Sequence, residues 1–111
     1  MAVATQEMIE EMVKAIVDEV NPVQIILFGS QVSGNTTPDS DVDLLVVDDQ
    51  PFGPQRSRHN QIKRIRRSLS PYRIPKDILV YSQNEVDKWR NSINHIIARS
   101  LREGKVIYER Y

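Results

Sequence analysis

The sequence predicts an α/β (α+β) fold, in which helices pack on one small mixed β-sheet. Two observations support this prediction. Short β-branched apolar runs alternate with amphipathic stretches, and the predicted order is helix, strand, strand, helix, strand, helix, strand. With 111 residues, the chain is expected to form a single domain over residues 1–111. It is short for an enzyme that holds two substrates alone, so part of the active site is expected from another chain.

The first helix is predicted from two apolar rows at helical spacing. These rows contain Met8, Met12, Ile16 and Val20, and Ile9, Val13 and Val17. Thr5 is placed to cap the start of this helix, and Asn21-Pro22 is expected to end it.

Four short segments are expected to form the sheet. The runs at residues 23–28 and 41–47 are typical of buried strands, and a third run follows at residues 77–82. The last residues, 105–111, are expected to add an edge strand.

Two further helices are predicted between and after these strands. Apolar residues at helical spacing indicate a helix within residues 52–72, with its basic side chains on the opposite face. Ser82 and Glu85 form a capping-box pattern before the last helix, and Gly104 is expected as its C′ residue. The apolar stripe of this last helix, with an interruption expected near Asn91-Ser92, contains Val86, Trp89, Ile93, Ile96, Ile97 and Leu101.

The charges are distributed unevenly, although the formal net charge is zero. Up to Asp49 the chain carries many acids and the single base Lys14, whereas residues 50–76 contain no acid. The bases of this second segment are Arg56, Arg58, Lys63, Arg64, Arg66, Arg67, Arg73 and Lys76. Such a block is most often a solvated helix face, and the overall charge lacks a nucleic-acid footprint, so nucleic acid is not the expected partner.

The composition excludes several classes of protein. There is no cysteine, so neither a disulfide framework nor a thiolate zinc site is possible. No apolar run approaches the length needed to span a bilayer, and the N-terminus lacks a basic n-region followed by an apolar h-region. The chain is therefore expected to be cytoplasmic, without contact to a membrane.

Three aspartates are the candidate catalytic residues. Asp41 and Asp43 would project from the same face of one strand, with Cα atoms roughly 6.5 Å apart. Asp77 opens the next strand, and if the two strands are neighbours all three carboxylates meet at one edge. Such an all-oxygen set suits Mg²⁺, and it offers a carboxylate to accept a proton from an attacking hydroxyl.

Gly29 and Ser30 follow the first strand. A glycine there lets the backbone approach a ligand closely, and Ser30 supplies a hydroxyl at the start of the loop. Taken alone, this pair is also compatible with an ordinary turn.

The spacing of these residues resembles that of the minimal nucleotidyltransferase (MNT) family of the DNA polymerase beta-like superfamily. Gly29-Ser30, ten further residues and Asp41-Val42-Asp43 are followed by a strand aspartate at Asp77, and "LREGKVIYERY" is similar to the usual ending of the family. One position departs from the pattern. Where the family commonly has Gly-Ser-Arg-x-x-Gly, Gln31 replaces the arginine and removes a candidate contact to the nucleotide phosphates or to a partner.

The resemblance implies a polymerase beta-like nucleotidyltransferase fold and the transfer of a nucleoside monophosphate, usually AMP from ATP, to an acceptor hydroxyl. In such an enzyme Gly29 and Ser30 would hold the triphosphate. Asp41, Asp43 and Asp77 would bind two Mg²⁺ ions, and Asp77 would assist deprotonation of the acceptor.

Small members of the family act as antitoxins beside a HEPN-type toxin, and some modify a tyrosine of that toxin. The resemblance therefore implies a HEPN-type partner. Two other hypotheses stay open: a binding module that neutralises a partner by contact, and an RNA-modifying nucleotidyltransferase that uses the basic block. Apolar residues left exposed on the last helix would also permit a homodimer.

Overall fold

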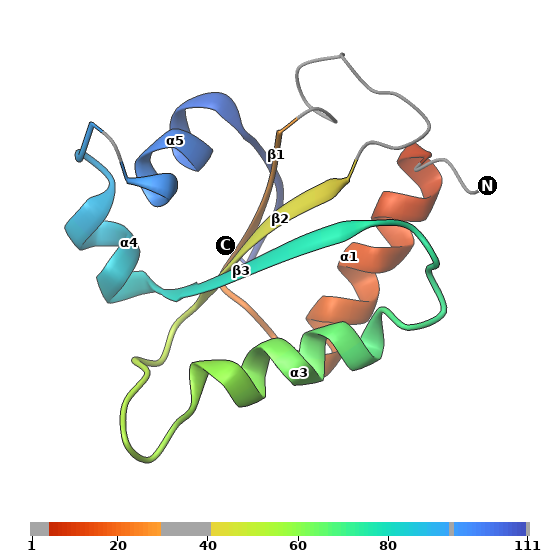
Figure 1. The fold of residues 1–111 in the computed structure, drawn as a ribbon, viewed down its shortest axis with the longest axis horizontal. Coiled ribbons are helices and arrows are strands. Elements are labelled where there is room, and N and C mark those ends of the chain that lie inside the picture. The colour runs from red at the N-terminus through yellow and green to blue at the C-terminus, as the bar shows by residue number, and fades with distance from the viewer. Residues whose placement is uncertain (1–4, 30–40, 94, 111) are drawn as a thin grey trace.

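The computed structural model describes residues 5–29, 41–93 and 95–110. The elements of this part of the chain, drawn in Figure 1, are α1 (Gln6–Val20), β1 (Gln24–Phe28), β2 (Val42–Asp48), α3 (Arg58–Ser68), β3 (Lys76–Ser82), α4 (Gln83–Trp89), α5 (Ile96–Glu103) and β4 (Lys105–Glu109). Their order confirms the predicted one, with the last predicted helix divided into α4 and α5. No helix among the described residues is both long and apolar enough to cross a membrane.

The strands form one mixed sheet in the order β3-β2-β1-β4. β1 pairs antiparallel with both β2 and β4, whereas β2 pairs parallel with β3. A parallel pair needs a long crossover connection, and the segment containing α3 supplies it. The mixed sheet predicted from the sequence is therefore confirmed.

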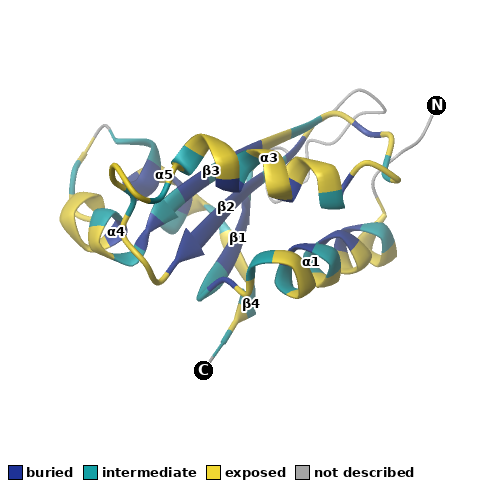
Figure 2. Ribbon diagram, turned by 90° about the horizontal axis from the view of Figure 1, so that it is seen from below, coloured by how far each residue is buried: buried dark blue, intermediate teal, exposed yellow. Residues whose placement is uncertain are grey.

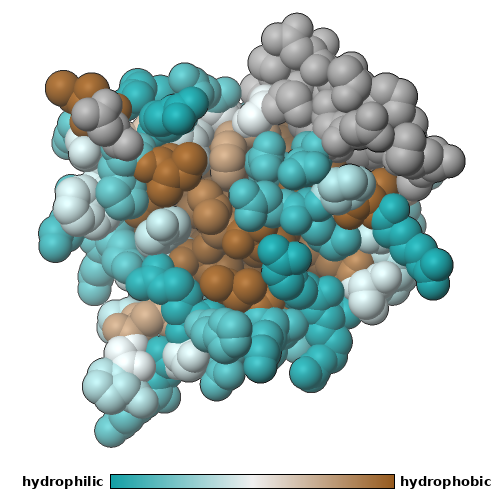
Figure 3. Space-filling view, in the orientation of Figure 1, coloured by the Kyte–Doolittle hydropathy of each residue, from teal (hydrophilic) through white to brown (hydrophobic). Residues whose placement is uncertain are grey.

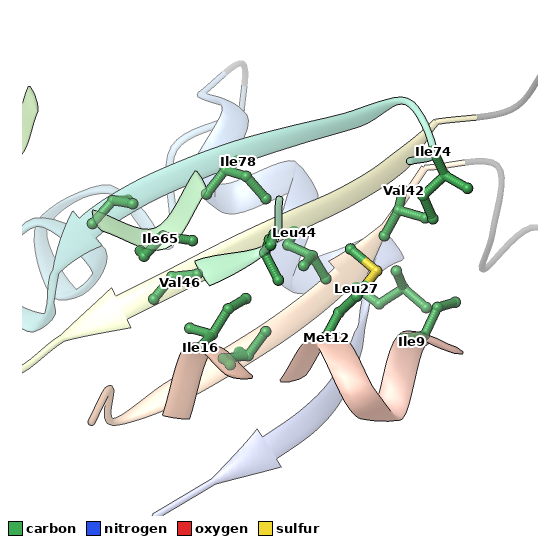
Figure 4. Packing of buried hydrophobic residues seen from close by; sticks show 13 residues of the cluster. Ile9, Met12, Ile16, Leu27, Val42, Leu44, Val46, Ile65, Ile74 and Ile78 are labelled. Atoms are coloured by element: carbon green, nitrogen blue, oxygen red, sulfur yellow. The ribbon is translucent and has the colours of Figure 1, made fainter. Parts of the chain in front are cut away.

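Helices cover both faces of the sheet, but unequally (Figure 2). α1 and α3 pack on one face, where their buried side chains join those of β1, β2 and β3 in the larger hydrophobic cluster. Figure 4 shows Met12 and Ile16 of α1 and Ile65 of α3 directed toward Leu44 and Val46 of β2. The shorter helices α4 and α5 contribute Val86 and Ile97 to a second, smaller cluster on the opposite face.

Local capping explains where the helices begin. The hydroxyl of Thr5 accepts a hydrogen bond from the backbone N–H of Met8 at 3.0 Å, and Ser57 caps α3 in the same way. Ser82 and Glu85 form the predicted capping box, because each side chain accepts a hydrogen bond from the backbone of the other.

The last predicted helix is interrupted, and this changes which of its apolar residues are buried. α4 ends at Trp89 and α5 begins at Ile96, with His95 as the N-cap of α5. Ile93 lies in the connection and is 81% exposed, and Trp89 is also exposed. The rings of Trp89 and His95 stack with their centroids 4.6 Å apart. The interruption expected near Asn91-Ser92 is therefore confirmed. The prediction that Trp89 and Ile93 belong to the buried apolar stripe is wrong, because both side chains are exposed.

Gly104 also differs from its prediction as a C′ residue. It is the C-cap of α5, with extended backbone angles (φ −88°, ψ 174°) in place of the left-handed ones typical of C′ glycines. A Cβ at this position would lie 2.3 Å from the carbonyl oxygen of Ser100 and 2.7 Å from Cγ2 of Ile26. Glycine is required because the last turn of α5 and the neighbouring β1 both lie too close to this position for a side chain.

Candidate active site

Two of the three candidate aspartates lie side by side on neighbouring strands. β2 and β3 are parallel, and their register pairs Asp43 with Asp77. Side chains paired in this way leave the same face of a sheet, and neighbouring strands are roughly 4.8 Å apart. From the sequence, this pairing depended on whether the two strands are neighbours in the sheet. The strand order shows that they are.

The aspartates lie on the face of the sheet that α4 and α5 cover only in part. Asp43 shares its face of β2 with Leu45 and Val47, both of which pack in the smaller hydrophobic cluster. That cluster occupies the end of the face next to the helices. Asp77 and Asp41, at the other end, are exposed. The carboxylates are therefore accessible to ligands from this side of the sheet.

Asp43 is held in an electrostatically unfavourable position. Partial burial and, to a smaller extent, the negative charges of Asp77 and Asp41 together raise the pKa of its carboxyl group to about 6. All three carboxylates thus interact at the start of β2 and β3. A bound cation is the ordinary way to stabilise such a group of like charges.

Gly29 is packed against this group. β1 and β2 pair Phe28 with Asp43, so Gly29 follows immediately beyond the pair. A Cβ added to Gly29 would lie 2.1 Å from Oδ2 of Asp43, and the φ of Gly29 is +79°, in the left-handed region. The backbone that begins the predicted nucleotide-binding loop therefore touches a candidate catalytic carboxylate. Ser30 and Gln31 lie outside the described residues.

The donor chemistry fits divalent cations. Asp41, Asp43 and Asp77 offer only carboxylate oxygens, the hard donors that Mg²⁺ prefers. Within the described ranges, no three acidic or histidine side chains close around a single point as a complete metal-ligand set. The three aspartates share one end of the sheet, where Asp43 and Asp77 lie opposite each other on neighbouring strands.

Backbone and side-chain contacts hold the start of β3 in this position. The N–H of Val42 donates to the carbonyl of Pro75 at 2.9 Å. The ammonium group of Lys76 donates to the carbonyls of Tyr72 and Ile74 at 2.8 and 3.0 Å. These bonds tie the loop before β3 to both strands, and so fix the residue that precedes Asp77.

A second pair of acids on β2 and just after it is excluded from the site. Asp48 ends the strand, 3% exposed, and its Oδ2 accepts hydrogen bonds from Arg56 at 2.6 Å and Gln61 at 2.7 Å. Asp49 pairs with Arg110 at 2.9 Å. Both residues lie at the opposite end of β2 from Asp43, so they stabilise the fold and do not face a ligand. Both residues follow the apolar run of β2, whereas Asp43 precedes it.

Apolar side chains lie beside the carboxylates. Figure 3 shows hydrophobic side chains gathered in the middle of the view, over β2 and β3, with hydrophilic side chains around them. Phe28, Leu79 and Leu101 are half-buried on this face, against the smaller cluster. Because α4 and α5 are short, these side chains remain within reach of a ligand or partner that approaches the aspartates.

The cavities elsewhere in the described part of the chain have a different character. One of about 280 Å³ lies between α1 and β4 and is lined by Ile9, Val13 and Val106 among others. It contains none of the three aspartates.

Comparison with known proteins agrees with the geometry. The sequence model of the nucleotidyltransferase domain family matches residues 9–108. The fold is similar to that of a Sulfolobus solfataricus protein classed as a nucleotidyltransferase, with a TM-score of 0.64 and 18% identity over 94% of this chain and 79% of that one. It is also similar to a crystal structure of a toxin-antitoxin with AMP-PNP, with a TM-score of 0.58 and 17% identity over 90% of this chain and 73% of that one. A search of curated proteins found no match.

Proposed function

The chain belongs to the nucleotidyltransferase domain family, and on that premise we propose that it transfers AMP from ATP to an acceptor hydroxyl and releases pyrophosphate. The observation that carries this proposal is the register of β2 and β3, which pairs Asp43 with Asp77 at the edge that Gly29 adjoins. Phosphoryl-type transfer depends mainly on positioning and on neutralisation of charge, so a few well-placed groups suffice.

The chain's own residues have separate roles in this proposal. Gly29, with the neighbouring Ser30, holds the triphosphate close to the carboxylates. Asp41, Asp43 and Asp77 would hold two Mg²⁺ ions, which neutralise the charge that develops on the phosphate oxygens when bound. The exposed Asp77 accepts the proton of the acceptor hydroxyl. The acceptor oxygen then bonds to the α-phosphorus as the bond from that phosphorus to the bridging oxygen breaks.

We propose a protein acceptor, namely a tyrosine of a HEPN-type toxin, with this chain as its antitoxin. Two observations support a protein acceptor. A similar solved structure is a toxin-antitoxin with AMP-PNP, an analogue of ATP, and apolar side chains such as Phe28 and Leu79 flank the aspartates. Apolar surface beside a reactive group favours a folded protein as the acceptor over a charged polymer.

Transfer of a radioactive label tests the proposal. The protein is incubated with Mg²⁺, the toxin encoded beside it and ATP labelled either at the α- or at the γ-phosphate. Label from the α-position is expected on the toxin, and label from the γ-position is not. Asp43→Asn should abolish the transfer, whereas Asp18→Asn, a matched change of an exposed acid on α1, should leave it unchanged.

Asp43→Asn and a second variant, Asp41→Asn, separate enzymatic neutralisation of the toxin from neutralisation by contact. If Asp43→Asn and Asp41→Asn still neutralise the toxin without transferring label, the chain acts by contact alone and the proposed reaction is wrong. If label moves to RNA and not to protein, the acceptor is wrong.

A further inference from the structure

The solvent face of α3 and of the loop after it carries four exposed cations. This basic face of α3 consists of Lys63, Arg66, Arg67 and Arg73. It lies on the opposite side of the sheet from the candidate aspartates, because Ile65 of α3 packs in the larger hydrophobic cluster. A ligand on this face would therefore leave the nucleotide site accessible.

None of these four side chains has an acidic partner within the described part of the chain. Most of the other arginines there are engaged in ion pairs. Arg64, on the side of α3 next to α1, pairs with Glu19 at 3.2 Å, and Arg56 and Arg58 pair with Asp48 and Glu85. Because residues 50–76 contain no acid, the partners of Arg56, Arg58 and Arg64 all come from other segments of the chain. The positive charge of the basic face is thus left for an external anion.

The basic face has no apolar centre. The large hydrophobic residues that are exposed in the described ranges, Trp89, Ile93 and Val106, all lie on other elements. Figure 3 shows the surface over α3 as hydrophilic. Protein–protein interfaces usually bury an apolar core, whereas interfaces with nucleic acid are polar and positively charged. The character of this surface favours a nucleic acid over an acidic protein.

We propose that the basic face of α3 binds the phosphate backbone of a nucleic acid, independently of sequence and of the sugar. Arginine guanidinium groups bind phosphate oxygens in a bidentate way, and three of the four residues are arginines. Lys63, Arg66 and Arg67 lie within about 6 Å along the axis of α3, and Arg73 extends the surface into the loop after the helix. These four long side chains can each reach a phosphate, and no groove or base-reading pocket is required.

Fluorescence anisotropy with labelled single strands of twenty uridines, in EDTA and without nucleotide, tests this proposal. With four phosphate contacts, the affinity should fall with salt with a logarithmic slope of about −3, or roughly 50-fold between 50 and 200 mM salt. A deoxyuridine strand should bind equally well.

Two matched triple variants locate the binding surface. Neutralising Lys63, Arg66 and Arg67 to glutamine should reduce the slope by about 2 and weaken binding at low salt on the order of tenfold or more. Neutralising three exposed cations elsewhere, Lys88, Arg102 and Lys105, should leave both quantities unchanged. Circular dichroism confirms that both variants are folded.

Three outcomes would overturn the proposal. The first is equal loss, or no loss, in the two triple variants. The second is a preference of more than about tenfold for either sugar, because phosphate contacts carry no such information. The third is equal binding of a polyglutamate of the same charge, which would make the surface a non-selective site for anions.

Discussion

Oδ2 of Asp43 lies over the backbone of Gly29, at 2.1 Å from the point that a Cβ would occupy. No side chain fits between the first strand and this carboxylate. A side chain added at Gly29 should therefore displace the carboxylate of Asp43.

Gly29→Ala should impair both stability and activity. The alanine would have to adopt a φ of +79°, at a cost of about 1–2 kcal/mol, and its methyl group would displace the Asp43 carboxylate. A displacement near 1 Å can reduce catalysis on the order of 100-fold. Urea denaturation and the rate of label transfer measure the two effects. Gly53→Ala is the control, because a Cβ at Gly53 meets nothing within 4 Å. Its stability and its rate of label transfer should stay near those of the parent protein. Equal losses in the two variants would contradict the packing argument.

Asp43→Asn should stabilise the protein at neutral pH when no divalent cation is present. The folded-state pKa of about 6 lies above the usual value of 3.8. Protonated Asp43 therefore stabilises the fold at low pH, and that stabilisation is lost as the pH rises through about 6. Thermal denaturation in EDTA should give the variant a higher Tm than the parent at pH 7.5, and the difference should vanish toward pH 4.

Asp49→Asn is a control in which the Tm is expected to change in the opposite direction. The hydrogen bond from Arg110 lowers the pKa of Asp49, so its ionised form stabilises the fold at neutral pH and this contribution is lost as the pH falls. A lower Tm at pH 7.5 is expected for this variant. A rise in Tm for both variants would indicate a general effect of reducing negative charge.

Asp48→Ala should destabilise the fold far more than Asp49→Ala. Asp48 is 3% exposed and its carboxylate bonds to both Arg56 and Gln61, so its removal leaves the buried amide of Gln61 and the half-buried guanidinium of Arg56 without this acceptor, at a cost of about 3–5 kcal/mol. The pair of Asp49 with Arg110 is partly exposed and contributes about 1 kcal/mol or less. Free energies of unfolding from urea titrations measure both changes, and similar values would contradict the assignment of Asp48 as a buried anchor.

The interruption between α4 and α5 predicts unequal effects for two isoleucines. Ile97 is fully buried in the smaller cluster, so Ile97→Ala should cost about 2–5 kcal/mol. Ile93, which is 81% exposed, should tolerate the same change within about 0.5 kcal/mol. A large loss in Ile93→Ala, measured by urea denaturation, would mean that the connection is buried against another chain.

Local patterns were sufficient for the elements and for one part of the site. Thr5 and the Ser82–Glu85 capping box mark helix starts in the sequence because a side chain and a backbone N–H a few residues apart satisfy each other. The period of two along β2 likewise places Asp43 on the same face as Leu45 and Val47. These relations need no distant residue, so the sequence by itself determined them.

Other relations depend on which segments become neighbours, and only the tertiary structure decided them. Asp77 opposes Asp43 because β3 adds to β2 in parallel, and Gly29 meets the same carboxylate because β1 adds to the other side. Gly104 is required by the approach of β1 to the end of α5. Strand order results from the burial of both faces of the sheet by helices distant in sequence, a balance of packing that local periodicity does not contain.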